Sequence, residues 1–301
     1  MSGQNKLPHT TSSLSRWDLA PGADISNEAI AEILDHPRFG DAMRHIARRA
    51  LALMDAHPAH HRAFDDIGNF VLGMLALYLD ATSGLTHRKL RELCGGAGVL
   101  STGRATAILL RLRMIGYVRP VDDSQTRVRR YAPTDTMLAM FKARFRIEFE
   151  AIEKFEPEVG KLLARFDEPE VFRMVCAGCG AFMYDAAKGR RPEYDVLTAV
   201  GGKRSGMVMI FHLFLALDDG GAFPRPGKLD VNVAALAARL GTSRAHVLGL
   251  LRDFERAGYF TRGHPDSVEP VLAHVFARYY ATAFGGELCI AARICRELDR
   301  I

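Results

Sequence analysis

The chain has little of what marks secreted, membrane or signal-bearing proteins. Five cysteines among 301 residues are an odd number, which fits a reducing compartment better than a disulfide framework. Its aliphatic runs are interrupted well short of the roughly 20 apolar residues that cross a bilayer, so we expect no membrane partner. Residues 1–22 are rich in Ser, Thr and Pro and lack the apolar segment of a signal peptide. They predict a flexible N-terminal arm on a cytoplasmic protein.

The common enzyme motifs are missing too. We find no glycine loop that would cradle a phosphate, no nucleophile elbow and no zinc-hydrolase spacing, and we therefore predict no enzyme activity and no cofactor. Cys176 and Cys179 have a suggestive spacing, but zinc needs four ligands and the other cysteines are scattered, so no metal site is expected. For this pair, core packing and a redox switch both stay open. A loop is expected at residues 59–62, and His57, His60 and His61 are expected to be solvated in or beside it, with metal binding as the alternative.

Length and composition favour two globular domains. Hydrophobic residues make up 48% of the chain and charged residues 25%. A chain of 301 residues suits two cores of about 130 to 150 residues each. We therefore predict domains at residues 23–160 and 161–301.

The most informative feature is an internal repeat. Residues 101–117, STGRATAILLRLRMIGY, align without a gap with residues 243–259, SRAHVLGLLRDFERAGY. Each copy begins with a serine able to cap a helix and has apolar residues at helical spacing. Each ends at a glycine, Gly116 or Gly258, followed by tyrosine. Both copies predict a helix that leads into a strand.

Further patterns recur around the two copies. Residues 117–121 and 126–131 flank a polar turn and predict a β-hairpin, whereas the second copy lacks an arginine-bearing return strand and predicts a shorter one. Short helices are expected at 87–94 and 231–240, and long helices after each hairpin, at 135–155 and 271–299. The fold class is therefore mainly α with small β-hairpin wings.

Basic residues concentrate in the first repeat. The whole chain has a net charge of +5 and a pI near 9.0, which is only mildly informative. Residues 85–131, however, have a net charge of +7, whereas residues 229–264 have +2. A phosphate-contacting surface would require such a local excess.

Residues 85–131, the turn at 235–243 and the two Gly-Tyr pairs resemble the winged helix-turn-helix of bacterial transcription regulators. Each half, over about residues 65–155 and 205–285, resembles one protomer of the MarR (multiple-antibiotic-resistance regulator) type. The resemblance implies two such domains in tandem in a pseudo-two-fold arrangement, because these proteins work as symmetric dimers. It implies a sequence-specific regulator that binds double-stranded DNA in the nucleoid, as a pseudo-dimeric monomer or a homodimer.

The candidate DNA contacts follow from this geometry. Polar residues in the first two turns of a recognition helix can reach base edges, and wing arginines can contact phosphates or the minor groove. The alternative to DNA contact is that Arg104 lies on the solvated face of its helix. For His246, the alternative is an exposed side chain that does not read a base. The candidates are Ser101, Thr102, Arg104, Thr106, Arg127, Arg129, Arg130, Ser243, Arg244, His246 and Arg262.

Two other functions stay open. In a replication initiator or a chromosome-organising protein, one winged helix would make protein contacts. In a ligand- or redox-responsive regulator, a small-molecule effector or the Cys176 and Cys179 pair would control DNA binding.

Overall fold

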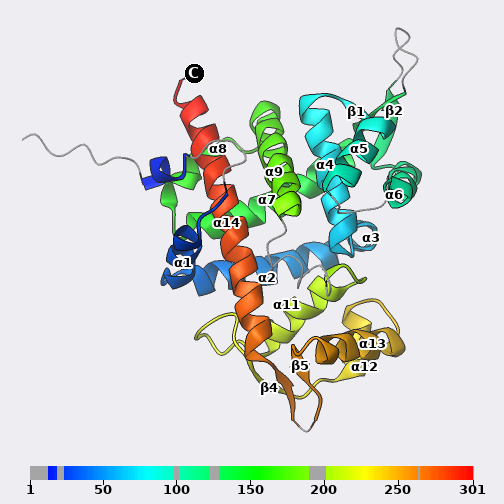
Figure 1. Ribbon diagram of the computed structural model, residues 1–301, viewed down its shortest axis with the longest axis vertical. Helices are drawn as coiled ribbons and strands as arrows, with labels where there is room; N and C mark the ends of the chain where they lie inside the picture. Colours follow the sequence, from blue (N-terminus) through cyan, green and yellow to red (C-terminus); the bar gives the residue numbers. More distant parts are fainter. Residues whose placement is uncertain are drawn as a thin grey trace, which may run out of the picture.

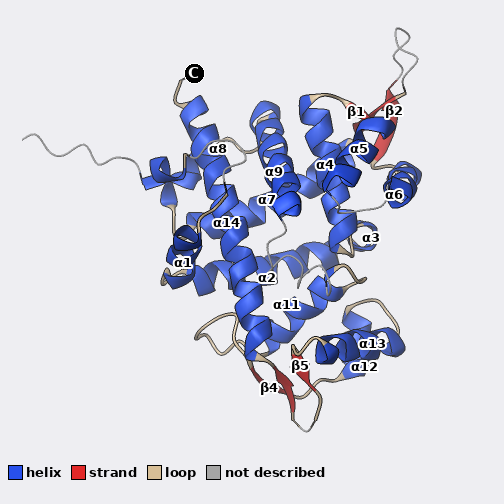
Figure 2. Cartoon of the chain, viewed as in Figure 1, coloured by secondary structure: helices blue, strands red, loops and turns tan. Residues whose placement is uncertain are grey.

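The computed structural model describes residues 13–18, 24–97, 102–121, 129–189, 201–263 and 265–300, which form a mainly helical protein with two small antiparallel sheets (Figures 1 and 2). The elements up to the first long helix are η1 (Ser13–Trp17), α1 (Asn27–Asp35), α2 (Phe39–Ala56), α3 (Pro58–Ala63), α4 (Ile67–Thr82), β1 (Leu85–Thr86), α5 (His87–Ala97), α6 (Thr102–Met114), β2 (Val118–Val121), β3 (Arg130–Pro133) and α7 (Asp135–Glu153). The later elements are η2 (Pro157–Val159), α8 (Gly160–Ala164), α9 (Pro169–Gly189), α11 (Gly206–Ala216), β4 (Gly227–Leu229), α12 (Val233–Arg239), α13 (Arg244–Arg256), β5 (Phe260–Thr261), β6 (Asp266–Val268) and α14 (Pro270–Leu298).

The first sheet unit comprises β1, α5, α6, β2 and β3, residues 85–133. Its strands lie in the order β1-β3-β2, and β3 is antiparallel to both neighbours. The pairing of β2 with β3 confirms the expected hairpin; of the predicted return strand, residues 126–128 lie outside the described residues, and β3 is described from Arg130. Gly116, with φ of 76°, ends α6 in the left-handed conformation that strains other residues.

The second sheet unit comprises β4, α12, α13, β5 and β6, residues 227–268. It repeats the same element order, and its strands lie in the equivalent order β4-β6-β5. Gly258, with φ of 73°, ends α13 as Gly116 ends α6. Strands β5 and β6 are short, as the sequence predicted.

The long helices α7 and α14 leave the two sheet units in the same way. The backbone N–H of Thr134 donates to the carbonyl of Tyr117 at 2.9 Å, and that of Glu269 donates to the carbonyl of Tyr259 at 2.9 Å. When the sequences of α7 and α14 are aligned with Thr134 opposite Glu269, their buried aromatic residues fall at equivalent positions. The matched pairs are Phe141 with Phe276, Phe145 with Tyr280, and Phe149 with Phe284.

Helices from the two halves pack on each other in matching pairs. Within each half, α2 packs on α7 and α9 packs on α14. Between the halves, α4 packs on α9 and α11 packs on α2, while α7 meets α14 (Figure 1). The contact of α4 with α9 is close enough to need glycine, because a Cβ at Gly180 would lie 2.3 Å from the Cβ of Tyr78. The two halves therefore share one core, and the boundary near residue 160 stays a prediction.

Two local expectations were wrong, and one short strand was not predicted. The loop predicted at residues 59–62 is the short helix α3. Helix α5 continues through Gly95 and Gly96 to Ala97, although the glycines predicted its end at Cys94. Leu85 and Thr86 form a strand because they pair with the distant β3. In the described part of the chain, every helix is too short or too polar to cross a membrane.

Candidate nucleic-acid interface

The second sheet unit exposes the first turn of α13. Ser243 is the N-cap of this helix, and its Oγ accepts a hydrogen bond from the backbone N–H of His246 at 3.2 Å. Val247 and Leu250 bury the inner face, whereas Arg244 lies in solvent and has no ion-pair partner among the described residues. This turn therefore offers an exposed cation beside a capped helix N-terminus, where backbone N–H groups favour anions.

His246 and Arg262 are less available than the sequence suggested. The ring Nε2 of His246 lies 3.0 Å from the carbonyl of Arg204, so it turns toward the segment before α11. Arg262 is exposed, but its backbone N–H lies 3.4 Å from Glu255 Oε1, and its guanidinium lies 4.0 Å from Glu255 Oε2. That carboxylate offsets part of the charge of Arg262.

Only some of the predicted DNA-contacting residues of the first unit belong to the described part of the structure. Ser101 and Arg127 lie outside the described residues, as do the side chains of Thr102 and Arg104. The side chain of Thr106 is partly buried, and its Oγ1 lies 2.9 Å from Nε2 of His87. Thr106 therefore joins α6 to α5 instead of pointing freely outward, so the prediction that it reads bases is disfavoured.

Two wing arginines are described. Arg129 is exposed and has no ion-pair partner in residues 129–189 or the other described segments. Arg130 opens β3 and is also exposed, but its guanidinium covers Gly84, where an added Cβ would lie 2.5 Å from Nη2. Arg130 therefore contacts the turn after α4, and Arg129 is the more accessible of the two.

Several exposed arginines surround these positions. In the described parts of both units they form no ion pairs, so they remain available to an anionic partner. They are Arg91, Arg113, Arg119 and Arg129 in the first unit, and Arg239, Arg244 and Arg252 in the second.

One exposed stripe of α6 is apolar, a feature that we did not predict from the sequence. Gly103, Ala107, Leu110 and Met114 lie at helical spacing on one face and are all exposed, Leu110 by 51% and Met114 by 86%. We call these four residues the α6 stripe. In the gapless alignment, α13 carries Arg252 and Arg256 where α6 carries Leu110 and Met114. The two units therefore present different chemistry at equivalent positions.

Cys176 and Cys179 lie buried on α9 as free thiols. Burial raises the pKa of Cys176 to about 12 and that of Cys179 well above its ordinary value. The reactive thiolate is thereby suppressed, which favours packing over redox chemistry. Within the described segments, no group of three or more His, Cys, Asp or Glu side chains is arranged to hold a metal.

His60 has a structural role that the sequence did not reveal. It lies in α3, where its Nδ1 is 3.2 Å from the hydroxyl of Tyr117 and its ring is 4.8 Å from the ring of Phe64. Burial lowers the pKa of His60 to about 4. This histidine connects α3 to the end of α6, and the expectation of a solvated loop histidine was wrong.

No protein-family model, curated protein or solved structure matches this chain.

Proposed function

We propose that this chain is a transcriptional regulator that binds double-stranded DNA through two winged helix-turn-helix units of the MarR-like type. The observation that carries the proposal is the repeated unit of strand, helix, helix, strand and strand, with the same strand order in both sheets. In such units the second helix enters the major groove and the hairpin contacts the flanking backbone.

The matching helix pairs support a single-chain pseudo-dimer. Because α4 packs on α9 and α11 packs on α2, the helix that precedes each sheet unit packs on a helix of the other half. Figure 1 shows both units on the same side of the view, one near the top and one near the bottom. Two recognition helices held by one core suit half-sites about one helical turn apart, roughly 34 Å. The differing residues on α6 and α13 favour a non-palindromic site.

Unpaired arginines supply the charge for phosphate binding. If about six phosphates are neutralised, log K should fall by about 5 per tenfold rise in salt. Arg244, at the exposed first turn of α13, is the described side chain best placed to reach a base edge.

The test is selection of bound duplexes from a random pool, followed by affinity measurements on the selected site. Arg244→Ala should relax the preference at a base position, with a loss of about 1 to 3 kcal/mol for the preferred base. Arg239→Ala is the control, because Arg239 is also an exposed arginine of the second unit but lies at the end of α12. It should weaken binding similarly for all sequences. Failure to enrich any sequence, at low salt and with the folded protein, would contradict the proposal.

The α6 stripe favours a second candidate role for the first unit, the self-association of two chains through α6. In an antiparallel pair of α6 helices, the large Leu110 and Met114 of one copy would lie over the small Gly103 and Ala107 of the other. Exposed apolar side chains at this spacing are typical of helix interfaces. An interface of one helix face is small, so we expect a weak dimer.

Analytical ultracentrifugation tests this role. Leu110→Arg combined with Met114→Arg gives α6 the arginines that α13 has, and this double variant should be monomeric at concentrations where the unmodified chain dimerises. Val271→Arg is the control, because Val271 is 45% exposed but lies on α14. A monomeric unmodified chain, or a dimer that survives the double substitution, excludes α6 self-association. A gain in DNA affinity with the double variant favours α6 as a DNA-facing helix.

A further inference from the structure

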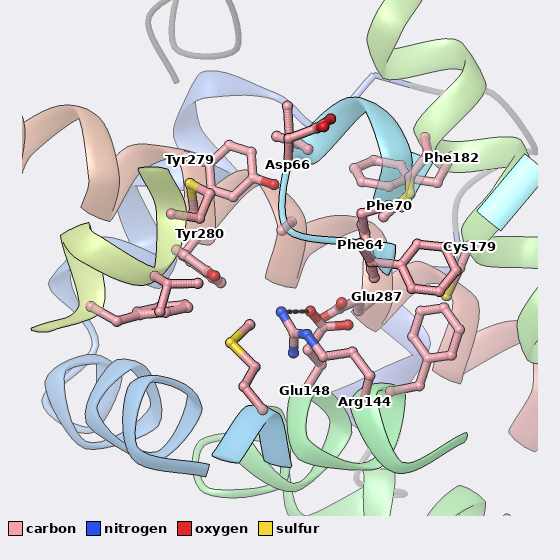
Figure 3. A pocket seen from close by; sticks show the side chains of 18 of the residues that line it. Phe64, Asp66, Phe70, Arg144, Glu148, Cys179, Phe182, Tyr279, Tyr280 and Glu287 are labelled. Carbon is pink, nitrogen blue, oxygen red and sulfur yellow. Dashed lines mark ion pairs between the residues drawn. The ribbon is translucent and has the colours of Figure 1, made fainter. Parts of the chain in front are cut away.

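A cavity of about 110 Å³ lies where α7 and α14 meet, next to the start of α4 (Figure 3). Its wall is largely apolar and aromatic, and both halves of the chain contribute to it. Among the apolar lining residues are Met54, Phe64, Phe70, Phe182, Met207 and Phe211.

Three ionisable side chains meet in this wall. Arg144 and Glu148 lie one turn apart on α7, and Nη2 of Arg144 is 2.7 Å from Oε1 of Glu148. Glu287 extends from α14, is only 7% exposed, and lies close enough to Glu148 for the two carboxyl groups to interact. Figure 3 shows the three together, with Tyr279 and Tyr280 across the cavity.

Two buried polar atoms of this cluster are unsatisfied. Within the described chain, Oε2 of Glu287 and Nη1 of Arg144 have no hydrogen-bond partner. An unsatisfied polar group in a protein interior costs about 1 to 3 kcal/mol, so two at one cavity call for an explanation. A bound ligand would satisfy them.

The charge of the wall indicates which ligand it would accept. Of the charged residues that line the cavity in the described chain, four are acidic and one, Arg144, is basic. Asp65 is paired with Arg204, its Oδ2 lying 2.7 Å from Nε, and Asp66 caps α4 by accepting from the backbone N–H of Asn69 at 2.9 Å.

The surroundings of Glu287 favour its protonated form. Burial, together with the adjacent Glu148 carboxylate, raises the pKa of Glu287 well above its ordinary value, and Arg144 offsets this only in part. Burial also raises the pKa of Tyr279 to about 12 and raises that of Tyr280, so both tyrosines stay neutral. The free cluster therefore has one guanidinium, one carboxylate and one neutral carboxyl group.

We propose that this cavity binds a small organic cation, an amine attached to a single aromatic ring, with its ammonium group donating to Oε2 of Glu287. The aromatic ring of the ligand would lie among the phenylalanine side chains. The faces of these side chains would also attract the adjacent ammonium group. A cavity of about 150 Å³ holds benzene, and the flexible Met54 and Met207 side chains let this somewhat smaller cavity take a ring with a short side chain. Nη1 of Arg144 remains available to a hydroxyl oxygen on the ligand.

Charge balance favours a cation over an anion. When the ammonium binds, Glu287 releases its proton to solvent, so two carboxylates then face one guanidinium and one ammonium. An anion at Arg144 would instead lie against the carboxylate of Glu148, which is repulsive. Binding of the cation should therefore release up to one proton per site.

The experiment is calorimetry of the purified chain with benzylamine, benzyl alcohol and benzoate, with each titration repeated in two buffers of different ionisation enthalpy. Benzylamine should bind with proton release, and the two other probes should bind at least about tenfold more weakly. Glu287→Gln replaces a neutral carboxyl group with a similar amide, so the variant should fold. It should weaken benzylamine about tenfold or more and abolish proton release. Glu297→Gln, at an exposed site on the same helix, is the matched control and should change neither.

Four results would overturn the proposal: no heat or thermal shift with benzylamine, equal binding of benzyl alcohol, preferential binding of benzoate, or unchanged benzylamine binding in Glu287→Gln. A thermal-unfolding scan of Glu287→Gln establishes that the variant is folded. None of these measurements involves DNA, so the cavity proposal and the regulator proposal fail separately.

Discussion

Replacing Glu287 with glutamine should change how the stability of the protein depends on pH. In the folded chain, burial and Glu148 keep this carboxyl group protonated, whereas in the unfolded chain it ionises near its ordinary pKa of 4.5. Above that pH the unfolded state binds fewer protons than the folded state. The stabilisation linked to the raised pKa is therefore complete below 4.5 and is lost as the pH rises toward the folded-state pKa.

The size of the effect follows from one proton. A single group that is protonated in the folded state and ionised in the unfolded state changes the free energy of unfolding by about 1.4 kcal/mol per pH unit. This loss accumulates as the pH rises above 4.5 for as long as the folded chain keeps the proton, and it is drawn from the roughly 5 to 15 kcal/mol that holds a typical domain folded. Glutamine cannot ionise, so the Glu287→Gln variant lacks this loss.

The assay is urea unfolding of the unmodified chain, Glu287→Gln and the control Glu297→Gln at several pH values from 5 to 6.5. Subtracting the curve of the unmodified chain from that of Glu287→Gln removes the titration of groups that do not interact with Glu287. The difference should rise with pH in favour of Glu287→Gln, and Glu297→Gln should show no such trend. Parallel curves for the unmodified chain and Glu287→Gln would refute the buried neutral carboxyl group.

The remaining predictions concern the helix ends and the half-buried His60. Ser243→Ala removes the cap of α13 and should lower the free energy of unfolding by about 1 kcal/mol in urea titrations, whereas an unchanged midpoint contradicts the capping bond. Gly116→Ala and Gly258→Ala should each cost about 1 kcal/mol through their left-handed backbone, because an added Cβ meets nothing within 4 Å at either site; a stabilised variant is the opposing result. His60 should titrate near pH 4 by NMR, and its depressed pKa should make the free energy of unfolding fall as the pH drops from 6.5 toward 4. His60→Gln should reduce that fall, and a His60 midpoint near 6.5 would contradict its burial.

The local sequence predicted the elements whose signals lie within one segment. The capping serine and the terminal Gly258 correctly place α13, and the apolar periodicity places α6 and α14 to within a few residues. The shorter second hairpin was also predictable, because the second copy lacks an arginine-bearing return strand like that of the first copy.

Features that depend on distant contacts were not predictable in this way. Strand β1 is two residues long and exists only because it pairs with β3. Helix α3 is six residues long, too short to be stable alone, and its burial against Phe64 and Tyr117 supplies what its sequence does not. The cluster of Arg144, Glu148 and Glu287 forms where α7 and α14 meet. The spacing of residues within either helix alone does not predict it.

The junction of α7 and α14 has one more consequence. If two identical chains met through this helix, every side chain near their axis would face its own copy, and an arginine would oppose an arginine. Here the alignment of the helices sets Arg144 against the position of Tyr279 and Ile152 against that of Glu287. Because both halves belong to one polypeptide, their facing surfaces do not need to be identical. The first half can therefore supply Arg144 and the second half Glu287. Neither half paired with itself would reproduce this cavity.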